Sequence, residues 1–119
     1  MKRIAIEEHF HTQGFLDCLR SRTDYPKVEL SRDQRNNELE LLWCAPGYYL
    51  PRTPDMTYRL LDMTDARLKE MDEAGIDMQV LSLVCPGPEV FDAPTGTRLA
   101  RETNDELSEL IKRLSLIHI

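Results

Sequence analysis

Short apolar runs separated by polar stretches organise the first half of the chain. A leading apolar run predicts a strand over residues 3–7, and apolar positions on one helical face predict a short helix over 15–20. The polar stretch 31–37 interrupts regular structure, and residues 38–43 are expected to form a helical turn or two. The segment 45–54, rich in proline and glycine, is typical of an ordered loop. The pattern therefore predicts one strand followed by a long, mostly irregular insertion.

The pattern becomes more regular in the second half. Thr64 is placed to cap a helix, and Gly75 lies where a left-handed residue would end it. Residues 77–84 predict a second strand, which the Cys-Pro-Gly-Pro sequence at 85–88 would close. A long amphipathic helix is expected over 97–113. This order of strands and helices is typical of an α/β fold with parallel strands.

Composition and charge narrow the class of protein. The chain has 119 residues, of which 41% are hydrophobic and 30% charged, as in one soluble globular domain. Its net charge of −6 and the lack of a lysine and arginine stripe disfavour nucleic acid and anionic membranes, so a small molecule is the expected partner. The leading apolar run is too short for a leader or a membrane span, and the three cysteines form no paired motif. A reduced, cytoplasmic protein is expected.

Metal-capable side chains follow the first strand directly. Side chains two apart on a strand share a face, so Glu7 and His9, or His9 and His11, are placed to bind one ion, whereas Glu8 should point the other way. A carboxylate and an imidazole suit Zn²⁺ or Mn²⁺, but a catalytic site needs at least one more ligand and an open position. The alternative is that these residues are only the polar end of a strand that enters a solvated loop.

The expected topology brings other residues to the same place. In α/β barrels and open α/β sheets, binding sites gather at the carboxyl ends of the strands, where Glu7 and His9 lie. The insertion carries Trp43, Tyr48, Tyr49 and Arg52, which would cover the carboxyl ends of the strands. Arg52 is our candidate for a contact to a substrate carboxylate. The two tyrosines have an alternative role in packing the loop.

Several sequence blocks together resemble a known family. The Glu-Glu-His-Phe sequence after the first strand is the specific motif, and blocks at 67–83, 86–87 and 100–105 support it by their order and spacing. The chain is similar to the amidohydrolase-related metal-dependent decarboxylases, within them to the γ-resorcylate, dihydroxybenzoate and carboxyvanillate decarboxylases. The resemblance covers most of the chain and is weak over about 15–57.

The resemblance implies a fold and an activity. It implies a distorted (β/α)8 TIM barrel in which Glu7 matches the first metal ligand and His9 the second. It also implies one divalent ion, Zn²⁺ or Mn²⁺, no organic cofactor, a homo-oligomer and a small aromatic carboxylate as substrate. The reaction would be that of a carbon–carbon lyase. The acid that protonates the ring follows a later strand in this family, so no catalytic residue is assigned to this chain.

The chain departs from the family pattern beyond its first helices and strands. The family needs a histidine from a middle strand and an aspartate near the last one, but after His11 the next histidine is His118. A complete barrel needs about 250 residues. We therefore expect residues 1–113 to be the N-terminal portion of the barrel, about two βα units with an insertion after the first strand. Sheet edges would remain open, so the isolated chain is expected to be inactive.

The end of the chain has a separate interpretation. Residues 114–119 resemble the translation of a transposase end sequence used in DNA library preparation, so we interpret them as adapter-derived. On this interpretation His118 is not a ligand. The nucleotide record would test the interpretation, because unrelated codons would contradict it.

Two other functions remain open from the sequence. A metal-dependent hydrolase or hydratase of the amidohydrolase superfamily would use the same two ligands, since these residues set the metal and not the substrate. A non-catalytic, small α/β binding module would use the polar cluster for solubility or for contact with a partner.

Overall fold

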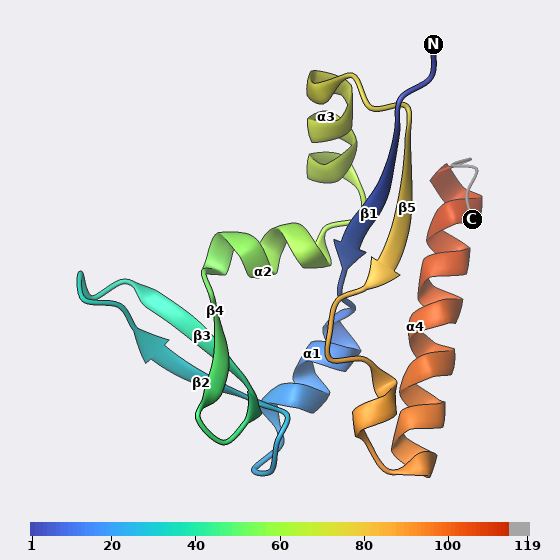
Figure 1. The fold of residues 1–119 in the computed structure, drawn as a ribbon. Coiled ribbons are helices and arrows are strands. Elements are labelled where there is room, and N and C mark those ends of the chain that lie inside the picture. Colours follow the sequence, from blue (N-terminus) through green and yellow to red (C-terminus); the bar gives the residue numbers. More distant parts are fainter. Residues whose placement is uncertain (115–119) are drawn as a thin grey trace.

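Residues 1–114 form a parallel strand pair, a three-stranded meander and four α-helices around two small cores (Figure 1). The structure is a computed structural model and describes residues 1–114. In chain order the elements are β1 (Ile4–Phe10), α1 (Gln13–Arg20), β2 (Lys27–Arg32), β3 (Glu38–Ala45), β4 (Tyr48–Arg52), α2 (Pro54–Leu61), α3 (Asp65–Ala74), β5 (Met78–Leu83), the 3₁₀ turn η1 (Pro88–Val90) and α4 (Ala93–Leu114).

The predicted parallel pairing is confirmed. Strands β1 and β5 run side by side in the same direction, and α3 connects into β5 (Figure 1). The pairing continues to the carboxyl ends of both strands, where His9 lies opposite Ser82 and Phe10 opposite Leu83. Both strand ends therefore meet at one edge, as the sequence predicts for a parallel sheet.

Helix α3 begins and ends where the sequence indicates. Gly75 takes the left-handed conformation, with φ of 66°, and the N–H of Ile76 donates to the carbonyl of Met71 at 2.8 Å. Thr64 is at the N-cap position, but its side chain makes no cap hydrogen bond. Asp62 does this instead, because its carboxylate accepts from the backbone N–H groups of Thr64 and Ala66 at 2.8 and 3.0 Å. Asp62, two residues before the N-cap position, therefore stabilises the start of the helix.

The insertion after the first strand is more regular than predicted. The expected helical turns at 38–43 and the expected loop at 45–54 are both wrong, since β2, β3 and β4 form an antiparallel meander. Short apolar runs do not distinguish strand from helix by periodicity, and cross-strand pairing decides here for strand. Asn36 and Gly47, both with positive φ, provide the two tight turns.

Helix α1 joins the meander to the rest of the molecule. Its predicted apolar face is buried, and Thr12 caps its start by accepting from the N–H of Phe15 at 3.3 Å. The face packs against β2 and β3 on one side and α4 on the other. The buried members of this main core are Phe15, Leu16, Leu19, Val28, Leu42 and Leu99. A second core of Phe10, Met63 and Leu110 lies between β1 and α4.

Helix α4 covers one side of the strand pair, and other apolar side chains remain open (Figure 1). It starts four residues before the predicted range of 97–113 and includes all of it. Ile6 on β1 is 78% exposed, and Val80 on β5 is also exposed. Apolar side chains of both strands therefore remain uncovered within residues 1–114.

No helix within residues 1–114 combines the length and apolar character needed to cross a lipid bilayer. The interpreted adapter segment 114–119 lies outside the described residues apart from Leu114, which ends α4. His118 lies outside them as well.

Candidate metal-binding site

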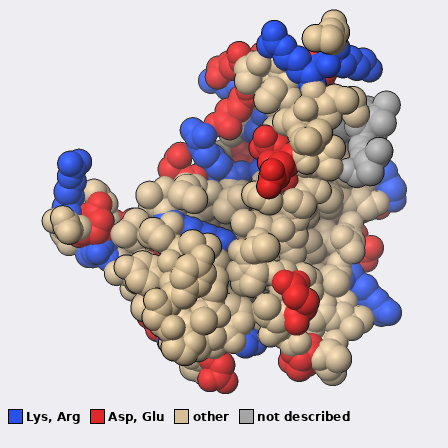
Figure 2. Space-filling view, viewed as in Figure 1, with Lys and Arg blue, Asp and Glu red and all other residues tan. Residues whose placement is uncertain are grey.

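A cleft of about 300 Å³ opens beside the carboxyl half of β1. Both predicted metal ligands, Glu7 and His9, line this cleft and are exposed. The rest of the wall comes from Glu8 on the same strand, from α2, α3 and the link between these helices, and from β5, and it is mostly polar or charged. These residues are Glu8, Arg59, Leu60, Asp62, Ala66, Arg67, Glu70 and Gln79. Figure 2 shows acidic and basic side chains intermixed over the upper part of this face, where α3 lies.

Glu8 and His9 follow the simple strand alternation. The pairing with β5 is regular from Glu8 to Phe10, so the side chains of Glu8 and His9 point to opposite faces of the strand pair, as predicted. The charge of Glu8 lies close to that of Arg67 in the cleft. The His9 ring contacts Ser82, and its backbone carbonyl contacts Arg67. A bulge in β1 precedes this regular part, because three steps from Ala5 to Glu8 lie opposite two steps on β5.

The imidazole of His9 is held from the neighbouring strand. Its Nδ1 lies 3.1 Å from the hydroxyl oxygen of Ser82, the residue opposite it in the parallel pairing. Nothing in the sequence pattern singled out Ser82, because the two residues lie 73 positions apart. The contact engages one ring nitrogen and leaves the other, Nε2, available for a ligand.

Arg67 donates hydrogen bonds to several backbone carbonyls around the cleft. Its Nη2 donates to the carbonyls of His9 and Arg59 at 2.9 and 3.1 Å. Its Nε donates to the carbonyl of Asp62 at 3.2 Å, and Nη1 donates to Oε1 of Gln79 at 3.2 Å. One planar guanidinium thus joins β1, the end of α2, the start of α3 and β5.

Replacing Arg67 with lysine is expected to destabilise the fold by about 2 kcal/mol. An ammonium is a compact charge on a flexible stem and has no fork of donors to span these four acceptors. Urea unfolding followed by circular dichroism would measure the change. Arg98→Lys is the matched control, since Arg98 is exposed on α4 and forms a surface ion pair with Glu102, and it should change stability by less than about 0.5 kcal/mol. Equal effects of the two substitutions would contradict the prediction.

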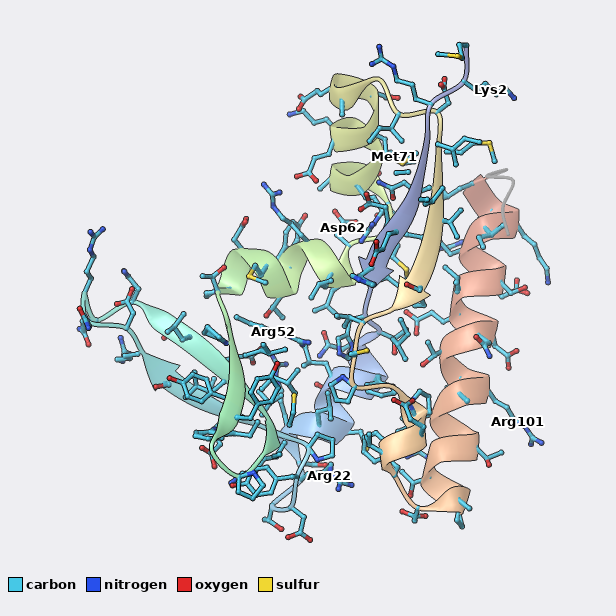
Figure 3. All side chains as sticks on the ribbon, in the orientation of Figure 1. Lys2, Arg22, Arg52, Asp62, Met71 and Arg101 are labelled. Atoms are coloured by element: carbon cyan, nitrogen blue, oxygen red, sulfur yellow. The ribbon has the colours of Figure 1, made fainter. Side chains whose placement is uncertain are left out.

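Arg52, the candidate substrate contact, is buried near the carboxyl end of β5. Only 4% of the residue is exposed, and Nη2 reaches the carbonyl of Cys85, just after β5, at 3.5 Å. No carboxylate within residues 1–114 lies in ion-pair range of it. Burial lowers the pKa of Arg52, and the charge of Glu40 opposes this. Arg52 lies between the meander and α1 (Figure 3) and does not line the cleft of Glu7 and His9.

The aromatic residues of the insertion pack mainly with each other. The rings of Trp43 and Tyr49 lie 4.8 Å apart across β3 and β4. Tyr48 and Tyr49 are exposed on the surface of the meander. The structure thus favours the packing alternative for Tyr49, whose ring contacts Trp43.

His11 lies inside the protein, away from the ion site. It is 1% exposed, its ring stacks edge-on against Phe15 with centroids 5.2 Å apart, and neither ring nitrogen has a hydrogen-bond partner within the described chain. Burial, and next the charge of Arg52, lower the pKa of His11 to about 4. The imidazole is therefore neutral at neutral pH. His11 does not line the cleft with His9, so the structure does not bring that pair together.

The donor chemistry of Glu7 and His9 fits a divalent cation, but two ligands do not complete a site. A carboxylate oxygen and a neutral imidazole are the ligands that Zn²⁺ and Mn²⁺ take. In residues 1–114 no group of three or more histidine, cysteine, aspartate or glutamate side chains is placed to hold a metal ion. Further ligands would have to come from outside this part of the chain.

The fold and the site define a class of protein. A carboxylate and an imidazole beside the end of a parallel strand, with helices following the strands, are typical of α/β enzymes that bind their ligands at this edge. The similarities of the chain point to one class among these, the amidohydrolase-related decarboxylases, and the resemblance predicted from the sequence is confirmed. No protein-family model matches the chain.

Two decarboxylases support this resemblance, and a third protein supports the fold. The chain is 29% identical over 113 residues to a gamma-resorcylate decarboxylase of Polaromonas sp., a match that covers 93% of the chain and 27% of the relative. The crystal structure of 5-carboxyvanillate decarboxylase from Sphingomonas paucimobilis matches with a TM-score of 0.67 and 32% identity over 94% of the chain and 31% of that protein. The apo structure of IDCase from Metarhizium anisopliae has a TM-score of 0.72 at 24% identity, over 94% of the chain and 32% of that protein, and supports the fold alone. The chain spans about a quarter to a third of the length of these relatives.

Proposed function

We propose that this chain supplies part of a metal-dependent enzyme that removes CO₂ from a hydroxylated aromatic acid. The observation that carries the proposal is the meeting of Glu7 and His9 in one cleft at the end of β1, in a chain whose relatives are decarboxylases. The chain would form about two βα units of a distorted (β/α)8 barrel, with the meander as the insertion after the first strand. The described parallel pair, with one helix before β5 and one after it, supports this proposal.

Glu7 and His9 would hold the cation. The Glu7 carboxylate contributes negative charge, and His9 contributes Nε2, because its Nδ1 already contacts Ser82. When bound, Zn²⁺ or Mn²⁺ would supply a positive charge that orients the substrate oxygens and offsets negative charge developed in the reaction. No organic cofactor is proposed, since a hydroxylated ring accepts a proton and releases CO₂ without one.

Arg52 would bind the substrate carboxylate. This guanidinium is almost fully buried, and within residues 1–114 it makes one long hydrogen bond and has no carboxylate in ion-pair range, so donors remain for a substrate in a medium of low dielectric. In the reaction a proton adds to the ring carbon that carries the carboxylate. The bond between this ring carbon and the carboxylate carbon then breaks, its electron pair restores the aromatic ring, and CO₂ leaves. The proton donor would come from outside residues 1–114. The complete enzyme would be a cytoplasmic homo-oligomer.

An assay of CO₂ release tests the proposal directly. The complete protein that carries this chain should release CO₂ from gamma-resorcylate or 5-carboxyvanillate after addition of Zn²⁺ or Mn²⁺, whereas the isolated 119-residue chain should not. Arg52→Ala should raise KM about tenfold or more, because a charged hydrogen-bond partner of the carboxylate is lost. Arg101→Ala is the control, since Arg101 projects from the outer face of α4 (Figure 3).

The other outcomes of this assay identify the alternatives. Hydrolysis or hydration without CO₂ release would favour a different reaction of the amidohydrolase superfamily. Cooperative unfolding of the isolated chain, with no catalysis by the complete protein, would favour a small binding module. An unchanged KM in Arg52→Ala would remove Arg52 from the substrate site.

A further inference from the structure

We propose that Ser82 is a positioning residue for His9: its hydroxyl accepts a hydrogen bond from Nδ1–H of His9 and thereby keeps the Nε2 lone pair free for a divalent cation. This inference rests on the proposed function, because it concerns one of the two proposed metal ligands. It adds a residue from the second strand to a site that the sequence motif places entirely on the first.

The strand pairing fixes the distance between the two side chains. His9 and Ser82 lie directly opposite each other in the parallel pair, and the next residues, Phe10 and Leu83, continue the pairing. Nδ1 of His9 lies 3.1 Å from the hydroxyl oxygen of Ser82, which is a normal hydrogen-bond distance. The backbone therefore presents the hydroxyl to the imidazole without a long, flexible side chain between them.

The backbone of His9 is held as well. Its carbonyl accepts from Nη2 of Arg67 at 2.9 Å, and this arginine also binds the carbonyls of Arg59 and Asp62. The position of the residue is thus fixed by Arg67, and the rotation of its ring by Ser82. A solvent-exposed histidine without the second contact would turn freely about its side-chain bonds.

The identity of the free nitrogen decides the direction of the hydrogen bond. A neutral imidazole carries one proton, so one nitrogen donates and the other accepts. Binding of a cation through Nε2 requires the proton on Nδ1, and a hydroxyl oxygen accepts from that N–H. Metal-bound histidines regularly donate their second ring N–H to such a partner, and loss of the partner typically weakens metal binding 10- to 100-fold. Ser82 provides this partner.

The tautomer of His9 is the first measurement. Ring nitrogen NMR of the 15N-histidine-labelled 119-residue chain at about pH 8, where a histidine with an ordinary pKa is neutral, should show the proton on Nδ1 of His9. His9→Ala assigns the signals among the three histidines of the chain. In Ser82→Ala the proton should shift toward Nε2, and Ser82→Thr, which keeps a hydroxyl, should restore Nδ1–H. Ser31→Ala, a strand serine in the meander, is the control. A proton on Nε2 in the unsubstituted chain would overturn the proposal.

Titration with Zn²⁺ alone is the second measurement. Ser82→Ala should weaken Zn²⁺ binding by about tenfold when His9 is present and have no effect when it is added to His9→Ala. An equal effect in both backgrounds would overturn the positioning role, because a purely structural effect does not depend on the ligand. Unchanged Zn²⁺ binding in His9→Ala would instead overturn the proposed metal ligand, and with it any role of Ser82 in metal binding, even where the tautomer is as expected.

Discussion

Replacing Glu7 by glutamine is expected to weaken cation binding by the complete protein by more than about 100-fold, with a matching loss of activity. Glutamine keeps the size and the position of the side chain but removes the negative charge, and its amide oxygen is a poor ligand for Zn²⁺. Glu7 is exposed in its cleft, so the substitution leaves no buried polar group without a partner. Metal content after dialysis and the rate of CO₂ release measure the two losses.

Glu8 provides the control for this experiment. Glu8 lines the same cleft, where its charge lies close to that of Arg67, and it alternates with His9 along β1. Glu8→Gln should change cation affinity by less than about threefold, because its loss reduces only the general electrostatic attraction of the cleft. A larger effect for Glu8→Gln than for Glu7→Gln would show that the ligand assignment within this pair of carboxylates is wrong.

The parallel part of the fold was predictable because its signals are local. Gly75 ends α3 in the left-handed conformation that glycine favours, and the apolar run at 77–84 contains β5. The meander had a shorter signal. Residues 38–41 alternate between glutamate and leucine, a pattern typical of a strand, but Leu42 and Trp43 end the alternation. The pairing with β2 and β4 that makes residues 38–45 a strand is visible only in the folded chain.

The candidate site was predictable only in its first residues. The Glu-Glu-His-Phe motif at the end of a strand indicates Glu7 and His9 directly. The bulge between Ala5 and Glu8 depends on the register between β1 and β5, which the sequence does not state. Ser82 and Arg67 reach His9 across 73 and 58 positions of the chain, so no spacing rule links them.

Arg52, from the insertion, and His11, just after the first strand, are both buried. Neither of them lines the cleft of Glu7 and His9. Arg52 was predicted from its charge in a segment expected to cover the site, and the structure places it near the end of β5 as a buried cation. His11 has the same spacing from His9 as His9 has from Glu7, yet it packs against Phe15 in the interior. Spacing along a strand therefore identified side chains that share a direction only as far as Phe10, where the strand ends.

Phe15→Ala is expected to destabilise the 119-residue chain by about 4 kcal/mol, since removal of a fully buried aromatic ring leaves a cavity as well as losing its transfer free energy. Phe15 is 1% exposed and contacts His11 and Phe91 edge-on, with centroid distances of 5.2 and 5.6 Å. It thus joins α1, the end of β1 and the turn before α4 in the main core. Urea unfolding followed by tryptophan fluorescence and circular dichroism would measure the change.

Leu30→Ala is the matched control for Phe15→Ala. Leu30 lies on β2 and is 84% exposed, so its truncation should change the free energy of unfolding by less than about 0.5 kcal/mol. Because the core around α1 is small, a loss of about 4 kcal/mol is comparable to the whole stability of a marginal domain, and Phe15→Ala should be largely unfolded near 37 °C. Similar midpoints for the two variants would show that α1 does not anchor the meander to the strand pair in solution, and the placement of Arg52 beside the end of β5 would lose its structural basis.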